Sequence, residues 1–492
     1  MAAAPAAPAP LAADRDARRL AELGYPQQLA RRMRVADNAA VGFAAISPVV
    51  GLYAVVLIGT VVAGPAWVWV LPVALAGQCL LLAVYAELAS EFPIAGGAYQ
   101  WTRRLMGPTY GWLTGWVSLC AYAVANTTIA YLGAPWLLAL LGVPATPGRV
   151  VAAGFVLVAA CAAIGLLGVG ALQRAIRAGI GAELVASVGI GVALLLAFRR
   201  QDLGLLTHTL GAPQATGTTT AGGLLAALAV GGWVFIGFDA CVGTAEETRH
   251  AARHVPRAIW IALLGVAAVV VLDAVAVGLA HPDPGAIVAG RDVDPVTTAV
   301  TTSFGDWSTK PFAAVVLVAF LACGVAAQAL TARAMFSVAR DGVLPASRLL
   351  TRVDRRNCPS GATLVTATIA AAGLLLGLDA TAVGSLIAFG TAAIYVTFLL
   401  IAGAALVARL RGTWRPAGHV QLGRAGVVIN ALAVAWLAFE TINIAWPRTV
   451  LAPPGAPLYQ VWAAPLVLAL IAVAGVSYLI VARPLRRRDA ST

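Results

Sequence analysis

A carboxylate inside a long apolar run is the residue of this 492-residue chain that is best placed to do chemistry. Asp239 lies within GGWVFIGFDACVGTAEE, residues 231–247, between Gly237 and Gly243. A charged side chain at bilayer depth costs roughly 3 kcal/mol, so an acid there usually marks an ion or substrate path. Glycines beside it favour a helix that breaks and frees backbone groups to hold a ligand. The segment therefore predicts a helix break at residues 236–239.

A second helix break is predicted in the first apolar run, which reads AAVGFAAISPVVGLYAVVLIGT. Pro48 has no amide proton and its ring clashes with the preceding turn, so we expect this helix to open at residues 47–52, where Gly51 also lies. The two breaks are five apolar runs apart. That offset is typical of carriers built from two inverted halves, each with a discontinuous helix at the matching position. The simpler interpretation is that proline and glycine are merely common in membrane helices.

Other kinds of active site find little support in the sequence. The five histidines lie in loops without the paired spacing of a zinc site. Five of the six cysteines fall within apolar runs, which does not indicate a disulfide framework. We find no Gly-x-x-x-x-Gly-Lys-Ser/Thr loop for ATP and no paired nucleophile and base. We therefore expect no cofactor and no metal, and a protein that is not an enzyme.

The elements that must position Asp239 are membrane spans. The chain is 60% hydrophobic and 11% charged, and its mean hydropathy is +0.87, far beyond a soluble domain. We predict an all-α integral membrane protein with twelve transmembrane helices, near residues 39–63, 66–88, 111–135, 149–169, 176–198, 222–245, 256–280, 311–338, 361–378, 381–408, 425–446 and 459–481. Two further segments, residues 96–106 and 283–304, look amphipathic and are not expected to span.

The placement of basic residues predicts the orientation. One set of alternating segments holds 27 of the 33 Lys and Arg residues, and the other set holds only six: Arg149, Arg199, Arg200, Arg291, Lys310 and Arg448. By the positive-inside rule the first set, with both termini, is cytoplasmic in a multi-pass protein of the cell membrane. The net charge of +12 then indicates topology and contact with anionic lipid of the bilayer, and no nucleic-acid partner is expected.

Four sequence blocks, in the correct order, resemble the amino acid/polyamine/organocation transporter superfamily, most closely its amino acid/choline transporter branch. They are ISPVVGLY (46–53), ELASEFPIAGGAYQWTRRLMGPTYGWLTGW (87–116), WVFIGFDACVGTAEETRHAARHVPRAI (233–259) and ARDGVLP (339–345). The resemblance implies a LeuT-like fold with a 5+5 inverted repeat. We accordingly expect a disordered cytosolic tail (1–35), a ten-helix transport core (36–410, repeats about 39–200 and 222–410), two additional helices (411–482) and a basic cytosolic tail (483–492).

The same resemblance implies a substrate site at the two helix breaks. In a LeuT-like site, the amides freed in the first span face the substrate carboxylate, which assigns Val49, Val50 and Gly51 to that role. Ser47 supplies the nearest hydroxyl. Val49 and Val50 stand where many relatives have small residues, so a substrate with its carboxylate elsewhere, or with none, stays open.

The amine end of the substrate is expected to meet backbone carbonyls near Ile46, Trp233 and Ile236. The Trp233 ring matches a position that can stack on substrate in relatives, consistent with cation–π attraction to ammonium groups, although an indole packed between helices is an equal alternative. Gly237 and Asn126 complete the predicted substrate site.

Two carboxyl groups are predicted to serve gating or proton coupling. Asp239 matches an acid of the arginine/agmatine exchanger branch, where it takes part in gating and proton sensitivity, although a structural carboxylate that caps the broken helix is an alternative. Glu183 lies near the region where related carriers place a cation or a substitute charge. Charged residues of the inner loops can form ion pairs that open and close with the gate, although ordinary structural ion pairs are an equal alternative. These residues are Arg103, Arg104, Glu246, Glu247, Arg249, Arg257, Arg340 and Asp341.

The sequence thus predicts a secondary active transporter that moves an amino acid or related small amine by alternating access. Coupling to H+ is favoured over coupling to Na+. One alternative is a carrier for choline, γ-aminobutyrate or a polyamine, and one of another class is a non-transporting membrane sensor with the same fold. The sequence leaves the oligomeric state open.

Overall fold

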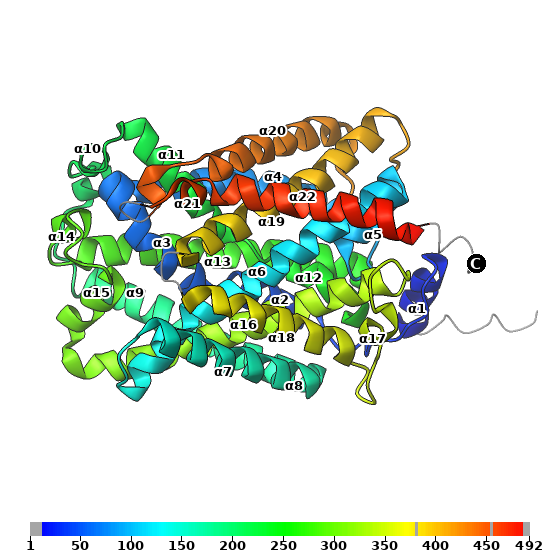
Figure 1. Ribbon diagram of the computed structural model, residues 1–492, viewed down its shortest axis with the longest axis horizontal. Coiled ribbons are helices and arrows are strands. Elements are labelled where there is room, and N and C mark those ends of the chain that lie inside the picture. Colours follow the sequence, from blue (N-terminus) through cyan, green and yellow to red (C-terminus); the bar gives the residue numbers. More distant parts are fainter. Residues whose placement is uncertain (1–11, 379–381, 453–455, 486–492) are drawn as a thin grey trace, which may run out of the picture.

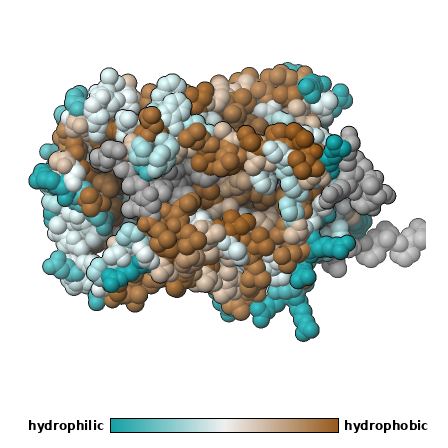
Figure 2. Space-filling model, viewed as in Figure 1, coloured by the Kyte–Doolittle hydropathy of each residue, from teal (hydrophilic) through white to brown (hydrophobic). Residues whose placement is uncertain are grey.

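The computed structural model describes residues 12–378, 382–452 and 456–485, and within these ranges it contains helices and no strands. Twelve of the helices in these ranges are long and apolar enough to cross a membrane. The long helices run along the length of the molecule (Figure 1). On the face seen in Figure 2, hydrophobic residues cover the middle and hydrophilic residues gather at the two ends. The predicted all-α, twelve-span membrane architecture is confirmed.

The spans follow one another along the chain, joined by connections that range from a few residues to segments with short helices of their own. They are α2 (Val35–Ile46) with α3 (Pro48–Ala63), α4 (Val70–Glu91), α6 (Pro108–Leu141), α7 (Pro147–Leu166), α8 (Val169–Glu183) with α9 (Ile190–Leu196), α11 (Thr220–Gly231) with α12 (Ala240–Gly243), α13 (Ala251–Ala280), α16 (Thr309–Ala339), α18 (Ser360–Leu374), α19 (Ala382–Leu410), α20 (Gly426–Ala445) and α22 (Ala463–Ala482). The predicted boundary between the ninth and tenth spans, residues 379–380, lies outside the described residues.

Short helices mark the two ends of the bundle. They are α1 (Ala12–Glu22), α5 (Gly97–Met106), α10 (Ala212–Ala215), α14 (Pro284–Val288), α15 (Pro295–Phe304), α17 (Ser347–Leu350) and α21 (Leu458–Val461). In Figure 1, α1, α5 and α17 lie at one end and α10, α14 and α15 at the other. We call these the α5 end and the α14 end. The two segments predicted to be amphipathic form α5 at the first end and α14 and α15 at the second.

The first span is broken at a single residue. Ser47, with φ 49° and ψ 107°, separates α2 from α3, and its hydroxyl oxygen caps α3 by accepting a hydrogen bond from the Val50 amide at 3.2 Å. The break is therefore narrower than the predicted residues 47–52. The reason is that Pro48 occupies the first position of α3, where a missing amide proton costs no helical hydrogen bond.

The sixth span is broken where the sequence predicted it. A 3₁₀ turn, Gly232–Phe235, follows α11, and residues 236–239 are not helical before α12 begins. Gly237 has φ +123°, and a Cβ atom there would lie 2.7 Å from the carbonyl of Ala45 in α2. Only glycine allows this approach, and it brings the two breaks together. Paired breaks five spans apart are the arrangement expected of the LeuT-like fold.

The N-terminal segment differs from its prediction. Residues 12–34, expected within a disordered tail, form α1 and a chain that packs on the α5 end (Figure 1). The reason is that apolar side chains recur along it: Leu20, Tyr25, Leu29 and Met33 are all at most 9% exposed. Met33 also pairs with Thr248 through a parallel β-bridge. Residues 1–11 and 486–492 of the two predicted tails lie outside the described residues.

Candidate functional site

A cavity lies between the two helix breaks in the middle of the bundle. Seven of the predicted site residues line it: Ile46, Val50, Asn126, Trp233, Ile236, Gly237 and Asp239. Its volume, measured as the space open to the centre of a water molecule, is about 40 Å³. One water needs about 10–15 Å³ on that measure, so this conformation is closed around space for a few waters.

Asp239 provides the negative charge of the cavity. Its carboxylate is only 4% exposed, and Oδ2 accepts a hydrogen bond from the Tyr122 hydroxyl at 2.5 Å. Its other oxygen, Oδ1, is buried without a hydrogen-bond partner. Tyr122 comes from α6 and was not predicted, because nothing in the sequence around it indicates that its hydroxyl faces Asp239. A buried acceptor without a donor costs about 1–3 kcal/mol, which a ligand that donates a hydrogen bond would relieve.

Asn126 extends this polar group across the cavity. Its amide donates to the backbone carbonyl of Tyr122 and to Oγ1 of Thr331, each at 2.7 Å. The Thr331 hydroxyl in turn donates to the carbonyl of Ala327, one turn earlier in α16, at 2.9 Å. These bonds fix the Asn126 side chain between α6 and α16 and use both of its amide protons.

The four other predicted site residues lie behind the first break and do not line the cavity. The Glu183 carboxylate, 3% exposed, accepts hydrogen bonds from the Ser47 hydroxyl and from the Val49 amide, the latter at 3.1 Å. The Val50 amide donates to Oγ of Ser47, and the Gly51 amide donates to the Ser47 carbonyl at 2.9 Å. In this conformation, the three amides expected to face a substrate carboxylate therefore have partners within the protein.

A second buried acid lies close to Glu183. Ser187, in the π-helical turn Leu184–Gly189 that interrupts the fifth span, lies beside both Glu183 and Asp273 of α13. Asp273 is 2% exposed, and its Oδ2 has no hydrogen-bond partner. π-helical turns within α-helices often occur at functional sites. Among the described residues, no group of three or more His, Cys, Asp or Glu could hold a metal ion.

Ion pairs form at the α5 end. Most of the predicted charges take part, but Arg104 donates to Gln100 and to the Leu23 carbonyl instead, and Arg333, which was not predicted, supplies the partner of Glu247. Arg340 donates to both carboxylate oxygens of Glu246, at 2.6 and 3.2 Å, and Arg333 donates to Glu247 at 2.5 Å. Arg103 pairs with Asp341. The partners are largely buried, and Glu246 and Glu247 are at most 1% exposed. Removing one partner of such a buried pair is strongly destabilising, because the other charge is left buried without a partner, whereas exposed pairs contribute little.

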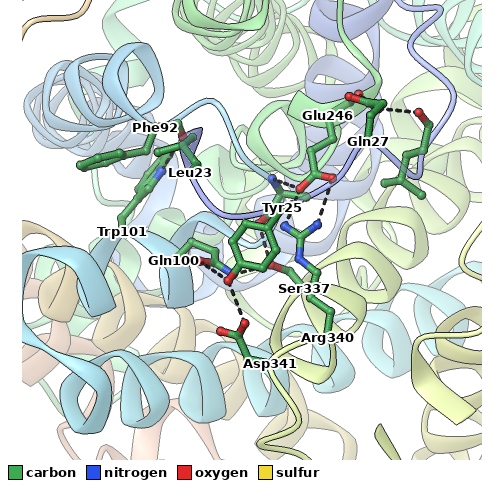
Figure 3. A network of polar contacts seen from close by, with 12 residues as sticks. Leu23, Tyr25, Gln27, Phe92, Gln100, Trp101, Glu246, Ser337, Arg340 and Asp341 are labelled. Atoms are coloured by element: carbon green, nitrogen blue, oxygen red, sulfur yellow. Dashed lines mark hydrogen bonds and ion pairs between the residues drawn. The ribbon is translucent and has the colours of Figure 1, made fainter. Parts of the chain in front are cut away.

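Tyr25 joins these ion pairs to the N-terminal segment, as Figure 3 shows. Its hydroxyl donates to Asp341 at 2.8 Å and accepts from the Gln100 amide at 3.0 Å, and the Arg340 guanidinium lies 3.8 Å from its ring centroid. Burial, with the neighbouring Asp341 carboxylate, raises the pKa of Tyr99 well above its usual range, so this hydroxyl stays a donor to Asp341. Tyr25 was not predicted, because its role depends on where the N-terminal segment packs.

Aromatic side chains close the bundle on the other side of the cavity, toward the α14 end. The ring of Tyr53 in α3 lies 6.4 Å from that of Trp136 in α6 and 6.0 Å from that of Phe312 in α16, centroid to centroid. The cavity thus lies between the charged groups of the α5 end and this cluster of rings.

Comparisons with known proteins agree with this architecture. Residues 39–476 match the sequence model of a family described as amino acid permease. The chain is 28% identical over 404 residues to cationic amino acid transporter 2, vacuolar, of Arabidopsis thaliana. This match covers 78% of the chain but only 61% of that relative, which is less than two thirds of its length. It is 26% identical over 468 residues to amino-acid permease BAT1 of the same plant, covering 87% and 88% of the two chains. It is 27% identical over 445 residues to branched-chain amino acid permease BcaP of Bacillus subtilis, covering 86% and 90%.

Proposed function

Because this chain belongs to the amino acid permease family, we propose that it is a secondary active transporter that moves an amino acid or a related small amine across a membrane by alternating access. The observation that carries the proposal is the closed cavity between two helix breaks that lie five spans apart. The relatives are named as transporters and permeases of amino acids, which also agrees with the expectation that the chain is not an enzyme.

The substrate site is the cavity, with the residues that line it and those of the first break behind it. Ile46, Trp233, Ile236 and Gly237 surround the substrate with backbone carbonyls and an indole ring, and Asn126 closes the cavity from α6. Alternating access then requires the ion pairs at the α5 end and the ring cluster toward the α14 end to open in turn.

Asp239 and Glu183 are the carboxyl groups that couple transport to H+ in this proposal. Both carboxyl groups are buried near the breaks, one on the cavity and one behind it, and each makes hydrogen bonds that depend on its charge. A proton that neutralises either group changes the bonds that hold the breaks together, which is how a proton can shift the balance between conformations. Na+ is the less favoured coupling ion.

The chain is a multi-pass membrane protein, and we place it in the cell membrane with both termini in the cytoplasm. Support comes from the bias of Lys and Arg toward the segments at the α5 end, such as those that contain Arg103, Arg340 and Arg409. On this assignment the buried ion pairs form the cytoplasmic gate.

Counterflow in proteoliposomes tests the function. Full-length protein is reconstituted into liposomes loaded with an unlabelled candidate, and entry of the same radiolabelled compound is followed with leucine, arginine, lysine, γ-aminobutyrate and choline. Exchange of at least one amino acid or amine above protein-free liposomes is expected, and an inward proton gradient is expected to change the rate of net uptake. Absence of exchange for every compound would contradict the carrier assignment and favour a sensor.

A further inference from the structure

The side-chain hydroxyl, amide and thiol groups that line the cavity already donate their hydrogen bonds within the protein. The Tyr122 hydroxyl donates to Asp239, and both amide protons of Asn126 are taken. The Thr331 hydroxyl donates to the carbonyl of Ala327, and the Cys323 thiol donates to that of Ala45 at 3.5 Å. Among the side-chain acceptors of the wall, Oδ1 of Asp239 is a buried carboxylate oxygen without a partner. The Trp233 indole N–H and the Gly237 amide also line the cavity and can donate to a ligand beside it. A group that donates hydrogen bonds and carries positive charge fits this wall.

The place for a substrate carboxylate is filled by the protein itself. At the start of α3, Glu183 accepts from the Val49 amide and the Ser47 hydroxyl. The next two amides of α3 donate to Ser47. A helix N-terminus favours an anion through its dipole and its unpaired amides, and here a side chain of α8 supplies that anion. A second carboxylate brought to this break would meet the charge of Glu183 and find none of these three amides free.

The charge of the cavity points the same way. Among its described lining residues, Asp239 is the one acid, and there is no Lys, Arg or His. A substrate carboxylate would therefore have no positive side chain on this wall to offset the loss of its hydration. The rest of the wall is mostly apolar, with side chains such as Ile129, Ile236, Ala327 and Ile394, which suits a short hydrocarbon body and does not suit a second charge.

We propose that the substrate is a small primary amine with an apolar body and no carboxylate, that its ammonium group binds Oδ1 of Asp239, and that Glu183 stands in for the missing carboxylate at the first break. This proposal rests on the proposed transport function and narrows its substrate class. Glu183 then serves as a specificity-determining residue, because its carboxylate excludes that of an amino acid. Asp239 serves as the substrate ligand.

Matched pairs of an amino acid and its decarboxylated amine test the proposal on the wild-type protein. The pairs are leucine with isopentylamine and valine with isobutylamine, which differ only in the carboxylate. Binding is measured by the rise in the unfolding midpoint of purified full-length protein, since a ligand that binds the native state stabilises it. Each amine is expected to reach half of its maximal effect at a concentration at least about tenfold lower than its parent amino acid, and to inhibit counterflow in the same order.

Three variants separate the two carboxylates. Asp239→Asn is expected to lose at least about 90% of the stabilisation by isopentylamine. Glu183→Ala, which frees the Val49 amide, is expected to lower the half-maximal concentration of leucine relative to isopentylamine. Glu440→Gln removes a buried carboxyl of α20 that does not line the cavity, and it is expected to leave both responses unchanged.

The outcomes distinguish this proposal from the transport function on which it rests. If leucine binds and exchanges while isopentylamine does neither, the amine proposal is overturned and the carrier assignment stands. Equal responses to both members of each pair would also overturn it, since the carboxylate would then be accepted. If neither compound binds and no other amino acid or amine exchanges in liposomes, the carrier assignment itself fails.

Discussion

Removal of Arg340 should open the α5 end of the bundle. The Arg340 side chain holds Glu246 with two hydrogen bonds and covers the ring of Tyr25, and Glu246 is fully buried with its Oε1 also bonded to the Ala95 amide. Arg340→Ala leaves Glu246 as a buried charge without its cation, which costs about 3–5 kcal/mol. Loss of the cation–π contact adds about 0.5–2 kcal/mol. The closed conformation loses this free energy, and an open one does not.

Exposure of a cysteine between the gate and the cavity measures the opening. Ser118 lines a small cavity that also contacts Asp239, Tyr99 and Val338, so it lies between the substrate site and the α5 end. Ser118→Cys changes one atom. Each 1.4 kcal/mol changes an equilibrium constant tenfold, so a loss of about 3 kcal/mol or more from the closed conformation makes the open one at least about a hundredfold more frequent. The alkylation rate at position 118, read by mass spectrometry against the six native cysteines, should rise accordingly.

Two further variants control this experiment. Arg348→Ala removes an exposed arginine of α17 at the same end and should leave the alkylation rate unchanged. Arg340→Lys keeps the charge but not the paired hydrogen bonds, so a smaller rise is expected. If Arg340→Ala folds, with an unfolding transition like that of the parent, and alkylation stays within about twofold of the parent rate, the reasoning on the gate is refuted.

Three further predictions concern stability and the helix breaks. Gly237→Ala should abolish counterflow and lower the unfolding midpoint, because the new Cβ would lie 2.7 Å from the Ala45 backbone. Gly204→Ala, which has open space around it, should leave both properties unchanged. An active Gly237→Ala protein would contradict the close approach of the breaks. Glu87→Gln should lower the free energy of unfolding, measured with chemical denaturant, by about 3 kcal/mol. The reason is that Glu87 pairs with buried Arg409 and accepts hydrogen bonds from Trp414 at 3.1 Å and from the Leu422 amide at 2.9 Å. A change under about 0.5 kcal/mol would rule this out. Burial disfavours the charged form of Asp292, but hydrogen bonds from His281 and the Asp294 amide outweigh that effect and hold the pKa of Asp292 below its ordinary value of 3.8. The charged carboxylate therefore stabilises the fold above pH 3.8, and this stabilisation is lost as the pH falls through the lower pKa of the native state. The unfolding midpoint of Asp292→Asn should therefore lie below that of the parent at pH 7 and approach it below about pH 4; a gap that widens in acid would contradict this sign.

The sequence was sufficient for the spans and for the breaks, because both arise locally. Runs of apolar residues predict spans by their length alone, and Pro48 and Gly237 act on the backbone at their own positions. The break at residues 236–239 was placed correctly, while the first break is narrower than predicted because Pro48 is accommodated at a helix start. Seven predicted residues do line one cavity, which follows once the two breaks meet.

The contacts of the site could not be read from the sequence, because they join segments far apart in it. Glu183 meets Ser47 across 136 residues, and Tyr122 meets Asp239 across 117. Tyr25 reaches Asp341 across 316 residues, and only the path of the N-terminal segment over the α5 end places it there. Such partners depend on how α6, α8 and α16 pack against the breaks, and no local pattern encodes that packing.

The central claim is that substrate passes through the cavity between the two breaks. Counterflow by the variant Ala327→Phe tests this claim most directly, because the new ring fills the cavity from α16. The wild type and Ala163→Phe, a matched change at an exposed position of α7, are the controls. The account predicts exchange of an amino acid or amine by the wild type and by Ala163→Phe, and none by a folded Ala327→Phe protein. Full exchange by Ala327→Phe would contradict it, because the transport path would then lie elsewhere.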